Sequence, residues 1–265
     1  MSDATTEPVR YETDGGVATI TLDRPEGMNA LTEATKEALR AAVERAADDA
    51  AVRAVVLTGS GRAFSAGQDL REHADNLAAG RGLDNTLRRH YNPIVEAITG
   101  MPKPVVAAVN GMAVGAGMSL VLACDLVVAS ERASFATAFS KIGLGPDSGL
   151  SWTLQRLVGR ARATELIMLA EPLRASDALT LGLVNRVVPS EEVLPAAAEL
   201  ARTLASGPTV AFAAIKTALV HAASHDLPSA LEREAELQDA LAETADHRNA
   251  TEAFLKKEQP TFEGR

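Results

Sequence analysis

The sequence is short of several residue types, and each shortage narrows the possible functions. Its 265 residues include one cysteine, Cys124, so no disulfide can form within the chain, and its apolar neighbours predict a small core residue. Aromatic residues make up only 3% of the chain, and alanine supplies much of the apolar content, which favours helices. No apolar run reaches the roughly 18 residues of a membrane-spanning helix. Residues 1–16 lack the apolar segment of a signal peptide, and we expect a cytoplasmic protein without a membrane partner.

Positive charge is also scarce. The chain has 26 Lys and Arg residues against 35 Asp and Glu residues, which gives a formal net charge of −9. A nucleic-acid partner is not expected, because a phosphate backbone calls for a basic surface. The remaining composition, 46% hydrophobic and 23% charged, is that of an ordinary globular enzyme with one or two domains.

The common cofactor motifs are missing as well. A dinucleotide fingerprint needs G-x-G-x-x-G after a strand. Gly59-Ser60-Gly61 lacks the third glycine because Phe64 takes its place, and Gly115-Ala116-Gly117 lacks it at Leu120. No G-K-S/T follows a glycine-rich loop, and the five histidines show neither zinc-site spacing nor cysteine partners. We therefore predict no metal site and no permanently bound cofactor.

The stretch 104–149 carries the strongest signal that is present. It opens with Val105–Val109, a predicted buried strand, and glycines on both sides of Ala116 then let the backbone approach a ligand closely. A short apolar helix from Met118 would point its free N–H groups at that ligand. The stretch ends on Asp147, which is set among glycines. We predict that backbone amides here hold a developing negative charge while Asp147 moves protons.

A second glycine-bearing turn, at 63–69, follows another apolar strand at 54–58. Two converging backbone amides are what the oxyanion of a thioester or enolate needs. Taken singly, glycine turns after strands are common, and an aspartate in such a turn is ordinarily a helix cap. The catalytic interpretation therefore depends on the two turns lying together.

Hydrophobic periodicity around these turns predicts an α/β fold. We expect strands at 17–22, 54–58, 105–109, 126–129 and 184–188, and helices at 32–48, 87–98, 152–158, 162–169, 176–181, 191–204, 209–223, 228–243 and 246–257. The polar segment 71–83 is expected to be a mobile part of the surface. Helices alone follow Gly207-Pro208, so we predict an α/β domain over 1–206 and a helical domain over 207–265.

Several stretches together resemble the crotonase superfamily, which includes the enoyl-CoA hydratases and isomerases. They are ITLDRPEGMNAL at 20–31, AFSAGQDL at 63–70, KPVVAAVNGMAVGAGMSLVLACDLVVAS at 103–130, LVGRARATELIMLAEPLRASDALTLGLVNRVVP at 157–189 and AFLKKEQPTFEGR at 253–265. The resemblance implies a ClpP/crotonase-like spiral of β-β-α turns with a helical C-terminal trimerisation domain. It also implies a homotrimer or dimer of trimers and an acyl-CoA thioester substrate, in which coenzyme A is part of the substrate.

The resemblance also assigns roles by position. The oxyanion amides would belong to Gln68 and Ala116. These two residues, with Ala66, Gly67, Asp69 and Leu70, would line the channel for coenzyme A and its pantetheine arm. The nucleotide end of coenzyme A would contact Arg24, Phe254 and Lys257, the last two from a neighbouring subunit.

The sequence departs from the family hydratases at two positions, and these departures indicate which reaction to expect. Family hydratases hold and activate water with two glutamates, and here Ser119 and Phe139 stand at those places. Hydration needs one group to take a proton and another to give one, which these residues cannot do. Asp147, in GLGPDSG, resembles instead the acid–base aspartate of Δ3,Δ2-enoyl-CoA isomerases and of the epoxyphenylacetyl-CoA isomerases of phenylacetate breakdown. We predict an isomerase that uses Asp147.

Three aromatic residues, Tyr91, Phe139 and Trp152, are candidates for shaping the acyl pocket, although each taken singly is more often a core residue. A hydratase that uses another group remains an alternative. An aryl-CoA dehalogenase, in which an aspartate at the place of Asp147 attacks the ring, is a second; that subgroup has tryptophan where this chain has Phe139. A non-catalytic RNA-binding or structural relative is a third alternative, and the acidic charge disfavours it.

Overall fold

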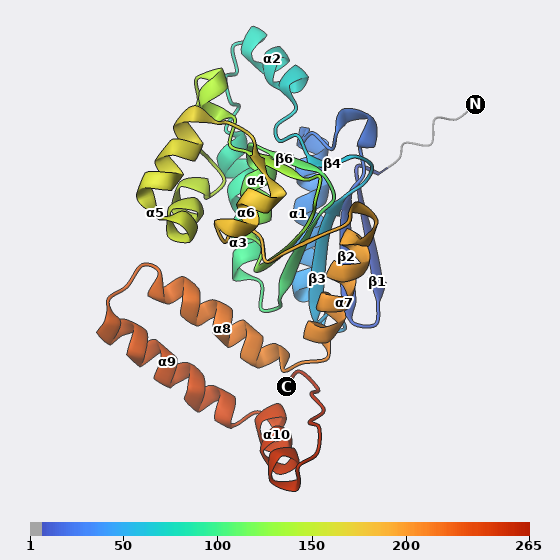
Figure 1. Ribbon diagram of the computed structural model, residues 1–265, viewed down its shortest axis with the longest axis vertical. Coiled ribbons are helices and arrows are strands. Elements are labelled where there is room, and N and C mark those ends of the chain that lie inside the picture. Colours follow the sequence, from blue (N-terminus) through green and yellow to red (C-terminus); the bar gives the residue numbers. More distant parts are fainter. Residues whose placement is uncertain (1–6) are drawn as a thin grey trace, which may run out of the picture.

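The computed structural model describes residues 7–265, whose strands form two sheets (Figure 1). The larger sheet has the order β1-β2-β3-β5-β7-β10, and the smaller has the order β4-β6-β8-β9. Their bounds are β1 Val9–Asp14, β2 Val17–Leu22, β3 Ala54–Gly59, β4 Ala63–Ser65, β5 Val105–Val109, β6 Met112–Val114, β7 Leu126–Ser130, β8 Ser134–Ala136, β9 Leu173–Arg174 and β10 Arg186–Val188. β1 and β2 form an antiparallel hairpin, and the other neighbours in the larger sheet are parallel.

Ten α-helices occur in the described residues. They are α1 Glu33–Asp48, α2 Leu70–Ala78, α3 Asn92–Gly100, α4 Ala116–Ala123, α5 Leu150–Leu169, α6 Ala175–Thr180, α7 Val193–Ala205, α8 Thr209–Ala222, α9 Leu227–Ala242 and α10 Ala245–Lys256. A π-helical turn at Leu87–Tyr91 leads into α3, and a short 3-10 turn at Phe139–Ile142 follows β8.

The chain passes alternately between the two sheets. β3, β5 and β7 are neighbours in the larger sheet, while β4, β6 and β8, which directly follow them, are neighbours in the smaller one. The pairs β3-β4, β5-β6 and β7-β8 therefore lie side by side, each stacked beside the pair before it. This arrangement is the predicted β-β-α spiral, and it brings the carboxyl ends of β4, β6 and β8 to one edge.

The larger sheet is buried on both faces, which explains its uninterrupted apolar strands. Along β3, Val55 and Leu57 pack into the core shared with α1, whereas Ala54 and Val56 pack against α7. The alternation follows from the two-residue period of a strand. α7 presents four small or branched residues to the sheet, Val193, Ala197, Ala201 and Ala205, and all are buried.

The structure corrects some predicted elements. The segment 71–83 lies on the surface, but 70–78 is the helix α2, because Asp69 caps it by accepting hydrogen bonds from Arg71 N at 3.0 Å and Glu72 N at 3.2 Å. The helices expected at 152–158 and 162–169 are both present and join as α5 across a break at Gly159. The sequence analysis missed β1 and the whole smaller sheet, whose strands have only two or three residues.

Helices α8, α9 and α10 extend to one side of the sheets (Figure 1). Lys216 of α8 attaches them to the spiral: its Nζ pairs with Asp125 Oδ2 at 2.8 Å and donates to the carbonyls of Ile98 and Lys103. Arg53, just before β3, donates to Thr209 Oγ1 at 2.9 Å and to the carbonyl of Phe262 at 3.0 Å. The spiral therefore holds both the start of α8 and the C-terminal tail.

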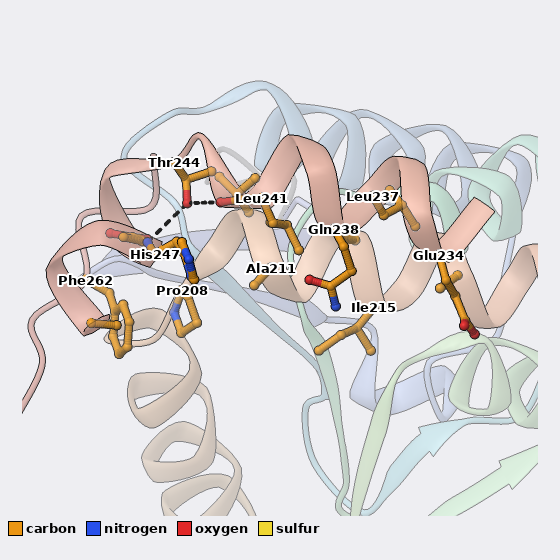
Figure 2. Close-up of a pocket in the computed structure, with 15 residues that line it drawn as sticks. Pro208, Ala211, Ile215, Glu234, Leu237, Gln238, Leu241, Thr244, His247 and Phe262 are labelled. Atoms are coloured by element: carbon orange, nitrogen blue, oxygen red, sulfur yellow. Dashed lines mark hydrogen bonds between the residues drawn. The ribbon is translucent and has the colours of Figure 1, made fainter. Parts of the chain in front are cut away.

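The three C-terminal helices leave much apolar surface uncovered. A groove of about 460 Å³ lies among them, with Ala211, Ile215, Leu237 and Leu241 on its walls (Figure 2). Ile215 is 54% exposed. Among residues 7–265, no single helix has the length and hydrophobicity to cross a membrane; Ser190–Ala205 and Thr209–Ala222 meet those criteria only as a pair bent by 104°.

Candidate active site

A cavity of about 140 Å³ opens at the carboxyl edge of the smaller sheet. Residues after β4, β6 and β8 line it, and the loop before α5 closes it with Asp147. Of the positions predicted for the channel, Ala66, Gly67, Gln68, Leu70 and Ala116 line this cavity, and Asp69 does not. The two glycine turns, far apart in the sequence, thus meet on one wall.

Glycine is required at Gly67 for this meeting. Its φ is +82°, and a Cβ atom there would lie 2.6 Å from the carbonyl oxygen of Val114. Any side chain would therefore push the turn after β4 away from the end of β6. Gly115 has φ +54°, also in the region that favours glycine, and it directs the chain from β6 into α4.

Gln68 and Ala116 line this cavity, and the backbone N–H of neither donates a hydrogen bond to another group among residues 7–265. Leu31 donates to Gly67 O at 2.8 Å and accepts from Asp69 N at 3.2 Å, so the amide between them, that of Gln68, points the opposite way. Ala116 is the first residue of α4, and its N–H therefore has no helical acceptor. Donors fixed in this way need no reorganisation to bind a developing oxyanion.

Asp147 is the only acidic residue among the described residues that line the cavity. Burial raises the pKa of its carboxyl group, while the Ser148 hydroxyl, which donates to Oδ1 at 2.7 Å, acts in the opposite direction. The carboxylate therefore holds a proton more readily than a solvated aspartate does, which suits a group that takes a proton and returns it. Burial, with the charges of Asp147 and Glu72, raises the pKa of Tyr91 well above its ordinary value.

The two hydratase positions hold no carboxylate. Ser119 is buried in α4, and its hydroxyl lies 3.3 Å from each of two carbonyl oxygens, those of Gly115 and Asp147. It therefore connects α4 to the loop that carries Asp147. Phe139 lines the cavity with an apolar ring. Neither residue supplies a carboxylate like those with which family hydratases hold and activate water.

The other predicted residues lie in different surroundings. Tyr91 lines the cavity as expected, but the prediction for Trp152 is wrong: it is 40% exposed on α5, with the Arg156 guanidinium 4.1 Å from its ring centre. Arg24 donates to Asp69 Oδ2 at 3.4 Å. Burial raises the pKa of Asp69, but hydrogen bonds from the backbone of Glu72 and Arg71 and from Arg24 outweigh it, so the pKa is lowered.

Phe254 and Lys257, the two residues expected to act in a neighbouring subunit, lie at the end of α10. Phe254 is 81% exposed, and neither residue lines the cavity of its own chain. Glu33, Glu37 and His90 bring possible metal-binding atoms within 4.8 Å of one another, and Glu33 and His90 share a small pocket with Gln68. Arg89 already donates to Glu33 at 3.0 Å, so a positive charge occupies the place a cation would need.

Comparison with known proteins agrees with this site. The sequence model of the family described as enoyl-CoA hydratase/isomerase matches residues 12–265. The chain belongs to this family. A probable enoyl-CoA hydratase from Rhodobacter capsulatus is 48% identical over 257 residues, which cover 97% of this chain and 98% of that protein. The 1,2-epoxyphenylacetyl-CoA isomerase of Escherichia coli is 40% identical over 251 residues, which cover 94% of this chain and 96% of that enzyme.

A solved structure of an enoyl-CoA hydratase/isomerase relative from Mycobacterium abscessus superposes with a TM-score of 0.93 at 45% identity, covering 97% of this chain and all of that one. The predicted crotonase fold is thereby confirmed. The chain is an enzyme-family member, and the enoyl-CoA hydratase/isomerase family acts on acyl-CoA thioesters. Hydration and isomerisation need different proton-transfer groups. The number of carboxylates in the cavity therefore helps to distinguish a hydratase from an isomerase.

Sequence analysis missed a partly buried polar cluster next to Gln68 that contains Lys36 and Glu72. Lys36 precedes Leu39 and Val43 at spacings of three and seven residues, so it shares their buried face of α1. A lysine on a face that is otherwise apolar was the signal available in the sequence.

Proposed function

We propose that this protein is an acyl-CoA isomerase that shifts a double bond or rearranges a ring epoxide. The observation that carries the proposal is that half-buried Asp147 is the one carboxylate among the described residues lining the cavity, which Gln68 and Ala116 also line. One carboxylate is enough for isomerisation, because the group that removes the proton can also return it. Hydration asks for a second proton-transfer group and a bound water.

The reaction follows from these three groups. In a 3-enoyl-CoA, Asp147 takes a proton from C2, and the resulting dienolate places negative charge on the thioester oxygen. The amides of Gln68 and Ala116 bind that oxygen. Protonated Asp147 then returns the proton to C4, which leaves a 2-enoyl-CoA. With a ring-epoxide thioester, the same amides would stabilise the enolate while the ring opens to an oxepin.

Coenzyme A itself is expected to run from the cavity along Ala66, Gly67 and Leu70. The resemblance to the crotonases supports nucleotide contacts by Arg24 and, from a neighbouring copy, by Phe254 and Lys257. A homotrimer or dimer of trimers would supply that copy. The exposed apolar side chains of 207–265 and the groove in Figure 2 support a helical domain that other copies cover.

The alternative function is enoyl-CoA hydration, because the relative at 48% identity is named a probable hydratase. A screen of the purified protein decides between the two. A 3-enoyl-CoA, a ring-epoxide arylacetyl-CoA and crotonyl-CoA would be incubated separately, and products followed by mass. Isomerisation leaves the mass unchanged and alters retention or absorbance, whereas hydration adds one water. Rapid hydration of crotonyl-CoA without isomerisation of either other substrate would reject the proposal.

A further inference from the structure

The side chain of Gln68 is held by a buried polar cluster. Its Oε1 accepts hydrogen bonds from the Tyr91 hydroxyl at 2.8 Å and from Lys36 Nζ at 3.1 Å. Its Nε2 donates to Glu72 Oε1 at 3.3 Å and to the carbonyl of Asp69 at 3.2 Å. Both ends of the amide are therefore occupied, and the residue cannot rotate without breaking several of these bonds.

Lys36 is the central cation of this cluster. Its side chain is 2% exposed, and Nζ also donates to Thr86 Oγ1 at 2.8 Å and lies 3.6 Å from Glu72 Oε1. Nζ further lies 5.2 Å from the ring centre of Tyr91. Burial lowers the pKa of Lys36, and Glu72 acts in the opposite direction. Burying an ammonium group lowers the stability of the folded protein. Replacing a buried ion pair with apolar residues of similar volume often leaves a protein equally or more stable.

The carboxylate partner is equally fixed. Both oxygens of Glu72 accept from Glu33 N, at 3.1 and 2.9 Å, so the side chain of α2 binds the positive end of α1. Lys36 and Glu72 thus both stand on helices, where a side chain is positioned more accurately than on a loop. The backbone of the turn around Gln68 is held by the two bonds of Leu31 and by Ala66 N, which donates to Met28 O at 3.0 Å, whereas the Gln68 side chain is held by the cluster.

We propose that Lys36 is a positioning residue for catalysis, which acts through the Gln68 side chain to fix the direction of the Gln68 N–H and the place of the Tyr91 hydroxyl. The inference rests on the proposed function, in which that N–H binds the thioester oxygen. The Tyr91 hydroxyl already donates to Gln68, so the cluster joins the oxyanion wall to the wall of the acyl pocket. A displacement of about 1 Å at a reacting group can lower turnover about 100-fold.

The test compares Lys36→Met with a matched variant, Lys103→Met. Lys103 is also buried, and burial lowers its pKa too, but its Nζ donates to the carbonyls of Ala46 and Asp49 outside the cavity. In Lys36→Met we expect kcat for the isomerase substrate to fall about 10- to 100-fold with KM little changed. Lys103→Met should lower the melting temperature and leave kcat near that of the wild type.

The infrared frequency of the bound thioester carbonyl provides a second measurement. A variant that is only less stable would not change this frequency. Hydrogen bonds from the two amides lower the carbonyl frequency, and in Lys36→Met the band should move back toward that of free thioester. An unchanged band and kcat in Lys36→Met, or equal losses of kcat in both variants, would overturn the proposal. If Lys36→Met does not fold, Tyr91→Phe removes one bond to Gln68 Oε1, and an unchanged band and kcat there would overturn it as well.

The experiments distinguish failure of the Lys36 proposal from failure of the isomerase proposal. The carbonyl band is measured on bound thioester without turnover, so it tests Lys36 even if the wild type proves not to be an isomerase. Loss of turnover in Asp147→Asn with full turnover and an unchanged band in Lys36→Met would leave the function standing and remove the role of Lys36.

Discussion

Replacement of Asp147 by asparagine tests the proposed chemistry at its one carboxylate. Asparagine keeps the shape and can still accept from the Ser148 hydroxyl, now 2.7 Å from Oδ1, but it cannot take a proton. Isomerase turnover should fall about 10²–10⁴-fold, which is about 2.7–5.5 kcal/mol of activation free energy. Acyl-CoA affinity should barely change, because the amides of Gln68 and Ala116 remain.

The pH dependence of the wild type provides a second test of the same residue. Because burial raises the pKa of Asp147, the acid limb of kcat/KM should lie above the ordinary value of 3.8 for an aspartate. Ser148→Ala removes a bond that favours the ionised form, so this limb should move to higher pH. A limb at or below the ordinary value would contradict the assignment.

Asp147→Asn should lower activity but raise the stability of the folded protein near neutral pH. A raised folded-state pKa means that ionisation of Asp147 costs stability as the pH rises through that pKa. Relative to the wild type, Asp147→Asn should therefore gain stability toward neutral pH and lose that gain below the unfolded pKa. Chemical denaturation at two pH values measures the difference.

A matched control is available at Asp125. Burial also raises the pKa of Asp125, but this carboxylate pairs with Lys216 outside the cavity. Asp125→Asn removes the carboxylate that pairs with Lys216 and should keep its turnover. If wild-type protein hydrates crotonyl-CoA efficiently and Asp147→Asn still isomerises at full rate, the assignment is wrong, and Glu72 would be the first carboxylate to examine.

Three further predictions concern the ligand, the oxyanion wall and the assembly. Acyl-CoA thioesters should raise the melting temperature whereas NAD and ATP should not, because a ligand that binds only the native state stabilises it; a shift with NAD alone would contradict this. Ala116→Pro removes one N–H donor and should lower turnover about 10²–10³-fold with circular dichroism unchanged; a folded variant with normal turnover would exclude that amide. Light scattering should show a trimer or hexamer, and Ile215→Glu or Leu219→Glu, at exposed positions of α8, should dissociate it; a stable and active wild-type monomer would refute the assembly.

Most helices, and the strands of the larger sheet other than β1, could be predicted, because their signals lie in local sequence. β3 and β5 are continuous apolar runs because both faces of the sheet are covered, and α1 shows its buried face through Leu39 and Val43. The smaller sheet could not be predicted. Strands such as β4 and β8 have three residues, too few to show a two-residue period.

The sequence by itself determined which groups were available: glycine turns after buried strands, one aspartate at the end of the central stretch, and no carboxylate at Ser119 or Phe139. Only the tertiary structure decided how they lie together. Gln68, Ala116 and Asp147 meet because β4, β6 and β8 pair side by side, and such pairing depends on contacts between residues distant in the chain. The same holds for Trp152, whose exposure on α5 no local pattern could reveal, and for the burial of Lys36, since a side chain's surroundings are set by the packing of several elements at once.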